Sequence, residues 1–306
     1  MYIPGMNADE SHRLQALLAE LRERIHARAH QPTGIDGVQV CAADRPSEPQ
    51  ASRSGTALAV IAQGSKRLAI GDRVYDYGPG QYLIASVDLP VIGHYTRATP
   101  DEPALGFGMI LRPPAVASLL LEAAANIASP RGRATAAPPG IGVADASPEL
   151  LDAVVRMVRL LDSPTDRQVL AASIEREILW RLLTGPLGAI AWQVGRSDST
   201  LTHIGRAVRW ITDHYSTPFR VEDLARSCSM SPSAFHRHFQ AVTALSPIQF
   251  QKQIRLQRSR LLLMTGADDV ATVGHRVGYG NTSQFSREYR RQFGLPPGRD
   301  AARLRA

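Results

Sequence analysis

A segment near the C-terminus recurs after fifty residues, and this internal repeat constrains the fold more than any other feature of the chain. Residues 235–239 (FHRHF) return as residues 285–289 (FSREY). Residues 221–228 and 269–277, which precede the two copies, have the length and apolar spacing of short helices. The offset changes from 49 in these short helices to 50 in the helices that follow, which predicts that the second turn is one residue longer. Two helices joined by a tight turn, present twice, indicate a tandem helix-turn-helix.

The second helix of each unit must bury one face and offer the other to DNA. Aromatic residues at helical spacing supply the buried face. The exposed face carries the residues expected to read base edges in the major groove: Ser233, His236, Arg237 and Gln240 in the first unit, and Ser283, Ser286, Arg287 and Arg290 in the second. We therefore expect double-stranded DNA as the partner.

A third helix, residues 247–265, is predicted to connect the two units. Its Phe250, Ile254 and Leu261 are expected to face inward, while Lys252 and Arg255 belong to a basic face that could lie along phosphates or pair with carboxylates. A helix of this length would space the two reading helices by about one turn of DNA, roughly 34 Å.

Charge is distributed unevenly along the 306 residues. Residues 201–306 contain 16 lysines and arginines against 7 acidic residues, whereas the first 200 residues contain 19 against 21. A basic segment releases counterions when it binds a polyanion, so this asymmetry favours nucleic acid as the partner of the C-terminal third. Neither a membrane-spanning apolar run nor a secretory signal stands out, and we expect a cytoplasmic protein without membrane contact.

The front half has the pattern of a small β-sandwich or barrel. Between residues 35 and 111, short apolar runs are separated by Gly and Pro, and about seven strands fit. An amphipathic helix is expected before them, over residues 11–28, and a helix pair after them, within residues 150–183, with a loop at 128–148. The expected organisation is α+β: a β domain with flanking helices over residues 1–184, a linker at 185–199, and an all-α domain at 200–306.

Residues 204–303 resemble the DNA-binding domain of the AraC/XylS family of bacterial transcription regulators. The resemblance is carried by Leu224-Ala225, residues 231–239, Ser246-Pro247, Arg255-Leu256, residues 277–279, residues 283–287 and residues 293–297. The front half is similar to the cupin-like N-terminal domain of one branch of that family, through residues 62–67, 77–83 and 87–90. The resemblance implies a dimeric regulator, more often an activator than a repressor, that is controlled by a small molecule and works with RNA polymerase.

The first unit departs from the family pattern at two positions. Ser229 and Ala244 stand where the second unit has Gly278 and Gly294, at places that favour a left-handed backbone. A non-glycine residue there costs about 1–2 kcal/mol, so the first unit is predicted to be locally softer. Gly274, in a helix of the second unit, acts in the opposite direction.

A small-molecule site in the β domain is predicted from strand position alone. Tyr82, Ile84, His94 and Tyr95 are the candidate lining residues. His94 is the one histidine between residues 35 and 111, so we expect neither a metal site nor another cofactor. Cys41 is either a sensor or a buried thiol, and the chain offers two cysteines, too few for a disulfide framework.

Two other functions remain open from the sequence. One is an enzyme fused to a DNA-targeting module, although no set of catalytic residues stands out and we expect no catalytic site. The other is a β domain that only dimerises, to which the apolar stripes of residues 150–161 and 169–183 could contribute.

Overall fold

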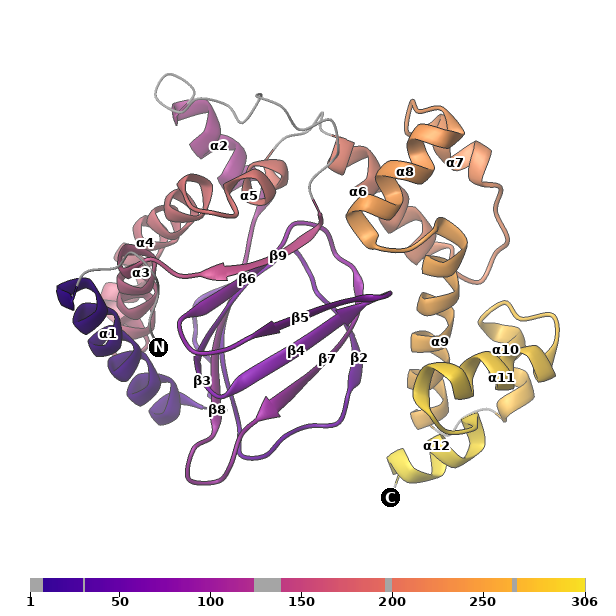
Figure 1. Cartoon of the computed structure of the whole chain (residues 1–306), viewed down its shortest axis with the longest axis horizontal. Helices are drawn as coiled ribbons and strands as arrows, with labels where there is room; N and C mark the ends of the chain where they lie inside the picture. The colour runs from indigo at the N-terminus through magenta and orange to yellow at the C-terminus, as the bar shows by residue number, and fades with distance from the viewer. Residues whose placement is uncertain (1–7, 30, 124–138, 196–199, 266–268, 306) are drawn as a thin grey trace. The chain divides into compact units, whose positions relative to one another are not determined.

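The computed structural model describes residues 8–29, 31–123, 139–195, 200–265 and 269–305. The chain divides into two compact units, Met1–Thr202 (unit 1) and His203–Ala306 (unit 2) (Figure 1). Unit 1 contains two β-sheets with helices, and the described part of unit 2 is helical, so the α+β fold class is confirmed.

Unit 1 is built on two antiparallel sheets. Sheet A has the order β1 (Val38–Ala43), β8 (Ala104–Ile110), β3 (Ala57–Gln63), β6 (Gln81–Ala85) and β9 (Ile141–Asp145). Sheet B has the order β2 (Gln50–Arg53), β7 (Pro90–Arg97), β4 (Ser65–Ile70) and β5 (Arg73–Tyr77). Eight of the nine described strands lie between residues 35 and 111, where about seven were expected. Strand β9 lies within the range 128–148 that was expected to be a loop, and residues 128–138 of that range lie outside the described residues.

Helices cover one face of sheet A. They are α1 (Ala8–Arg28), α2 (Pro113–Ala123), α3 (Pro148–Arg159) with a short 3-10 turn at Leu160–Asp162, α4 (Pro164–Thr184) and α5 (Gly188–Val194) (Figure 1). Their apolar residues form one core with the sheet, as Val154 and Ile178 pack with Val60 and Phe107. Helix α5 occupies part of the range 185–199 expected to be a linker. It is helical there because Ile190, with its neighbours, joins this core.

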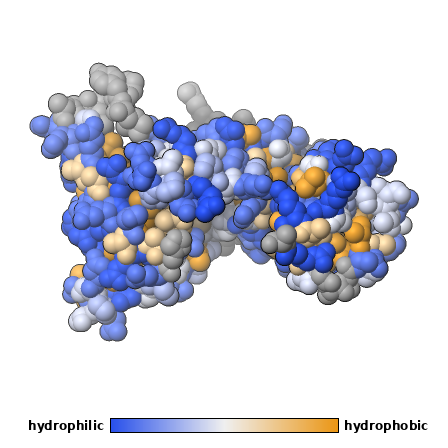
Figure 2. Space-filling model, turned by 90° about the horizontal axis from the view of Figure 1, so that it is seen from below, coloured by the Kyte–Doolittle hydropathy of each residue, from blue (hydrophilic) through white to orange (hydrophobic). Residues whose placement is uncertain are grey.

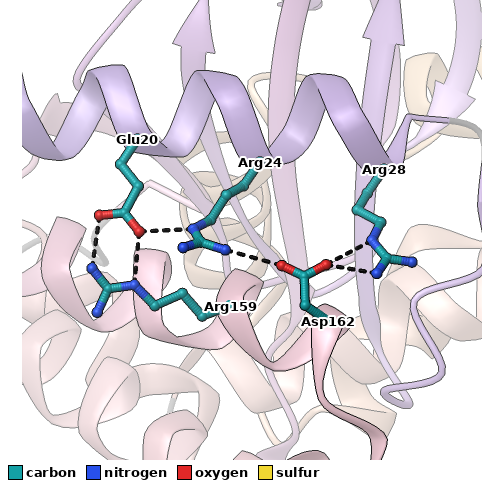
Figure 3. A network of polar contacts seen from close by, with 5 residues as sticks. All are labelled: Glu20, Arg24, Arg28, Arg159 and Asp162. Atoms are coloured by element: carbon teal, nitrogen blue, oxygen red, sulfur yellow. Dashed lines mark hydrogen bonds and ion pairs between the residues drawn. The ribbon is translucent and has the colours of Figure 1, made fainter.

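A chain of ion pairs fastens α1 to α3 and the turn that follows it (Figure 3). Glu20 accepts hydrogen bonds from Arg159 (2.7 Å) and Arg24 (2.7 Å), and Asp162 accepts from Arg24 (2.9 Å) and Arg28 (2.6 Å). The hydrogen bond from Arg159 contributes most to lowering the pKa of Glu20 from 4.5 to about 2, although partial burial opposes it. The network therefore stabilises the contact between these helices while Glu20 is ionised.

Unit 2 consists of seven described helices, with α9 running between two groups of them (Figure 1). They are α6 (Thr200–Asp213), α7 (Val221–Ser227), α8 (Pro232–Thr243), α9 (Pro247–Thr265), α10 (Val270–Arg276), α11 (Thr282–Phe293) and α12 (Pro297–Arg305). Phe250 and Ile254 of α9 are buried as expected, but Leu261 is 55% exposed, so its inward placement was wrong. Helix α9 makes its core contacts through Leu256 and Leu263 instead.

The face of the molecule drawn in Figure 2 is mainly hydrophilic. On the face drawn in Figure 2, apolar residues form small patches surrounded by polar ones. Across the described ranges, no helix combines the length and the hydropathy needed to cross a bilayer.

Candidate nucleic-acid interface

The fifty-residue repeat corresponds to two helix-turn-helix units of matching dimensions. Helices α7 and α10 have seven residues each, and α8 and α11 have twelve each. The first pair is offset by 49 residues and the second by 50, so the turn at 277–281 is one residue longer than the turn at 228–231. The longer second turn is confirmed.

The first helix of each unit ends in the same hydrogen-bonded motif. The six-to-one hydrogen bond of a Schellman motif runs from the N–H of Met230 to the carbonyl of Ala225, and from the N–H of Tyr279 to the carbonyl of Gly274, at 3.0 Å in both. The residue before each donor must then adopt a left-handed backbone. The two units therefore need the same backbone conformation at this position, although the residue is Ser229 in the first unit and Gly278 in the second.

Left-handed backbone occurs at four equivalent positions, and two of them lack glycine. In the turns, φ is 56° at Ser229 and 93° at Gly278, and at the ends of α8 and α11 it is 60° at Ala244 and 79° at Gly294. Ser229 and Ala244 are the non-glycine residues with positive φ among those described. The conformation expected at both positions is therefore retained, at a cost of about 1–2 kcal/mol each.

Helices α8 and α11 both begin with a side-chain cap. Ser231 accepts from the N–H of Ala234 (3.3 Å), and Asn281 accepts from the N–H groups of Ser283 (2.8 Å) and Gln284 (3.1 Å). Caps of this kind stabilise a helix start by about 1 kcal/mol. Both reading helices are thus fixed at their N-terminal ends, the ends that contact base edges in helix-turn-helix proteins.

The predicted reading residues lie on the outer face of each helix. Ser233, His236, Arg237, Gln240, Ser283, Arg287 and Arg290 are exposed, and Ser286 is half-buried. In the described part of the chain, no carboxylate pairs with Arg237, Arg287 or Arg290. Partial burial, and then the positive charge of Arg237, lower the pKa of His238, so this histidine is neutral at pH 7.

Lys252 and Arg255 do not lie free on a basic face. Lys252 pairs with Glu288 (2.9 Å), which is one of the two alternatives that the sequence left open. Arg255 donates to three carbonyl oxygens, those of Tyr215 (2.6 Å), Gly278 (2.8 Å) and Ser216 (3.2 Å). Burial lowers the pKa of Arg255. Every nitrogen of its guanidinium that can donate is used to join α9 to the second turn and to the segment after α6.

Aromatic residues hold α8 and α11 against their neighbours. Phe239 packs on Phe235 and Phe250, with ring centroids 5.5 Å apart in both pairs. Tyr289 packs between Phe285 (5.7 Å) and Phe293 (4.6 Å). The predicted buried faces are confirmed for the residues that lie at the centre, because Phe235, Phe239, Phe285 and Tyr289 are all inaccessible to solvent.

Two buried carboxylates support α11, and the sequence did not single them out. Asp300 of α12 accepts from Arg260 (2.9 Å) and from the hydroxyl of Tyr289 (2.9 Å). Glu288 accepts from Lys252 (2.9 Å) and from the hydroxyl of Tyr279 (2.9 Å). Burial alone would raise the pKa of Glu288, but these hydrogen bonds outweigh it and keep the group ionised. Their charged partners on α9 lie 36 and 40 residues away in the sequence, so spacing along the chain gives no signal of these contacts.

The four candidate effector residues of unit 1 lie on three different faces of the sheets. Tyr82 and Ile84 point into the core between sheet A and the helices, where they are 1% and 0% exposed. Tyr95 of β7 lies on the inner side of sheet B, with its hydroxyl 3.0 Å from Sγ of Cys41 in sheet A. His94, one residue earlier, lies on the outer side beside Asp76, whose pKa it helps to lower after Arg67. The structure does not bring these residues together.

The two cysteines are free thiols in different surroundings. Cys228 is 2% exposed and donates to the carbonyl of His203 (3.2 Å), and like the buried Val277 at the equivalent position it packs in the interior of unit 2. Cys41 contacts Tyr95 and the carbonyl of Gly106 (3.5 Å) between the two sheets. Within the described ranges, no group of three or more His, Cys, Asp or Glu residues is arranged to hold a metal ion.

Comparisons with known proteins agree with this architecture. Residues 34–190 match the AraC-type transcriptional regulator N-terminus, and residues 224–303 match a helix-turn-helix domain. The transcriptional activator RhaS of Klebsiella pneumoniae is 29% identical over 155 residues, which are 48% of this chain and 54% of RhaS. RhaS of Salmonella arizonae is also 29% identical, over 156 residues, which are 49% of this chain and 56% of that protein. The chain thus spans about half the length of the curated relatives it matches.

The solved structures of ToxT from Vibrio cholerae share the fold. One superposes with a TM-score of 0.53 over 89% of this chain and 100% of ToxT, at 10% identity. The family match at residues 34–190 covers more than half of the 306 residues, and the helix-turn-helix match covers both repeated units. The family consists of transcription regulators and not of enzymes, which speaks against the alternative of an enzyme fused to a DNA-targeting module. The chain belongs to the AraC-type transcriptional regulators.

Proposed function

We propose that unit 2 reads two successive major grooves of one DNA site, with α8 in the first groove and α11 in the second. The observation that carries this proposal is the pair of matching exposed faces, each capped at its N-terminus and each carrying an arginine without an ionic partner among the described residues. Arg237 and Arg287 occupy equivalent positions fifty residues apart and would contact guanine, the base that arginine most often recognises. Ser233, His236 and Gln240, and in the second unit Ser283, Ser286 and Arg290, complete the two reading surfaces.

The connecting helix supports the spacing. Helix α9 has 19 residues, which at 1.5 Å per residue give a length of about 28 Å, close to one DNA turn of roughly 34 Å. Lys252 and Arg255 are left out of the reading surface, because Glu288 and backbone carbonyls already occupy their donors.

The proposed regulation of DNA binding by a small molecule involves unit 1. We infer that unit 1 binds a small molecule and that the protein activates transcription, in contact with RNA polymerase. The RhaS relatives are transcriptional activators by name, and ToxT has been solved with a bound unsaturated fatty acid. The ligand would act by shifting the population between two arrangements of the units, which requires different ligand affinities in the two arrangements.

A homodimer is part of the same proposal. Helix α4 exposes Val169 (70%) and Leu170 (44%) to solvent, and Leu121 of the neighbouring α2 is 79% exposed. A second copy packed on these side chains would remove them from water. Dimers also raise the local concentration of reading helices at paired half-sites.

Anisotropy titration tests the reading surface. The wild type, Arg237→Ala and Arg287→Ala are titrated against upstream DNA fragments at two salt concentrations, and then against versions of the best fragment with one half-site randomised. Each variant should lose about 1–3 kcal/mol of binding free energy on the intact site and little on random DNA. This loss of affinity should disappear when the half-site contacted by the mutated helix is randomised, and it should persist when the other half-site is randomised.

Arg45→Ala is the matched control, because the side chain of Arg45 is 81% exposed in unit 1 and should leave affinity unchanged. If the two variants lose affinity equally on every fragment, the arginines contact phosphate and the assignment of base reading is wrong.

A further inference from the structure

A cavity of about 410 Å³ opens at one end of the β-sheets of unit 1. Its walls come from α1, the turn between β3 and β4, and the segment from the end of β7 to β8, and they include Arg22, Gln63, Thr96, Arg97 and Glu102. None of the four residues expected from strand position lines it. The volume lies at the lower end of the range for small-molecule sites, which suits a metabolite of modest size.

The charged residues of this cavity stand apart from the other arginines of unit 1. Within the described residues, Arg22 and Arg97 are the arginines of unit 1 that make no ion pair, hydrogen bond through the side chain, or ring contact. Both line the same cavity. Most other arginines of the unit, such as Arg53 and Arg156, are held by carboxylates.

The wall beside Arg97 is pre-formed. Gly64 adopts φ +78°, and a Cβ atom at this position would lie 2.4 Å from the carbonyl oxygen of Arg97 and 2.7 Å from Ala104. The glycine therefore permits the β3–β4 turn to pack closely against the backbone of Arg97. Gln63 and Thr96 are also fixed, since they donate to the carbonyls of Pro103 (2.9 Å) and Ser65 (3.3 Å).

We propose that this cavity binds a small hydroxylated or amino carboxylic acid. The lining carries two guanidinium groups and the carboxylate of Glu102, so one ligand carboxylate brings the site to neutrality. The guanidinium groups of Arg22 and Arg97 take the carboxylate, and Glu102 accepts a hydrogen bond from a hydroxyl or amino group of the same ligand. Such a ligand would bridge α1 and β7, which ties the helical layer to sheet B. This inference rests on the proposed control by a small molecule and names the site and the chemical class.

Matched acids and neutral compounds test the proposal on the full chain. Lactate, gluconate and galacturonate are compared with propane-1,2-diol, sorbitol and galactose by thermal shift, and positive compounds by calorimetry. We expect at least one acid to raise the unfolding temperature while its neutral counterpart does not. Arg22→Gln and Arg97→Gln should each lower the affinity for that acid at least tenfold. Arg13→Gln, on the same helix but outside the cavity lining, should leave its affinity unchanged.

The outcomes separate this inference from the proposed function. If no acid binds, if a neutral counterpart binds equally well, or if both cavity variants retain full affinity, the carboxylate site is wrong. Sequence-specific DNA binding is measured on the same preparations without added compound, and the cavity variants should retain it. If the wild type does not discriminate among DNA fragments, only the DNA-reading proposal is refuted. If an acid binds without changing the affinity for DNA, only the proposed regulation by a small molecule is refuted.

Discussion

Exchanging alanine and glycine between equivalent positions of the two helix-turn-helix units should change their local stability in opposite directions. Ala244 holds φ at 60° at the end of α8, and Gly294 holds φ at 79° at the end of α11. In Ala244→Gly the folded state is relieved of about 1–2 kcal/mol of backbone strain, while the unfolded state gains freedom equivalent to about 0.5–1 kcal/mol. The net stabilisation is about 0.5–1 kcal/mol. Gly294→Ala has the opposite sign, and nothing within 4 Å would obstruct its Cβ.

Hydrogen exchange on the full chain measures both changes locally. A stabilisation of about 0.5–1 kcal/mol corresponds to amide exchange that is about two- to fivefold slower across residues 221–243 in Ala244→Gly. Gly294→Ala should accelerate exchange across residues 270–293 by a similar factor. Gly278→Ala serves as a contrast, because its Cβ would lie 2.2 Å from the carbonyl oxygen of Ser216 and should cost more than strain alone.

Faster exchange in Ala244→Gly, or no change in Gly294→Ala, would refute the reasoning from backbone strain. In the wild type, residues 221–242 should exchange faster than residues 269–293. Gly274 reduces this difference, because a glycine inside α10 costs about 0.5–1 kcal/mol relative to the alanine at the equivalent Ala225. Slower exchange in the first unit would contradict the predicted softness.

Three further predictions concern charged groups. Glu20→Gln should lower the unfolding free energy at pH 7 by about 1–2 kcal/mol after solvent screening. Because the pKa of Glu20 is lowered from 4.5 to about 2, this contribution is complete above about pH 4.5 and is lost as the pH falls towards 2, so calorimetry should find a smaller difference at pH 3.5. Asp300→Asn should destabilise unit 2 by about 3 kcal/mol in urea unfolding, because Arg260 is left buried without a counter-charge, whereas Tyr289→Phe should cost about 1 kcal/mol. Lys252→Ala should leave the salt dependence of DNA binding unchanged, whereas loss of a phosphate contact would reduce its slope by about 0.9.

The helix-turn-helix units could be predicted in detail because their signals are local. Helix lengths, the additional residue in the second turn and the left-handed backbone at Ser229 and Ala244 all follow from short stretches of sequence and the geometry of a helix end. The exposure of Arg237 and Arg287 follows from helical spacing around a buried aromatic pair. Periodicity also predicts that Lys252 and Arg255 share a helix, but their partners lie 36 and 40 residues away, and spacing carries no information on such contacts.

The sequence could not show whether the four candidate effector residues of unit 1 share one site, for a reason that lies in the packing of the sheets. In a strand with one wet face, alternating polar and apolar residues identify the side that faces the core. Strand β6 lacks this alternation: Tyr82, Leu83, Ile84 and Ala85 are all buried, because helices cover the outer face of sheet A and sheet B lies against its inner face. A shift of one residue moves a side chain from one core to the other, so the sequence could not show whether Tyr82 and Ile84 face the same side as Tyr95. The cavity beside Arg22 and Arg97 is built from the ends of β3 and β7, the turns next to them and the exposed side of α1. At strand ends and turns the alternation along a strand gives no guidance, and the useful signal is structural: two arginines without partners among the described residues.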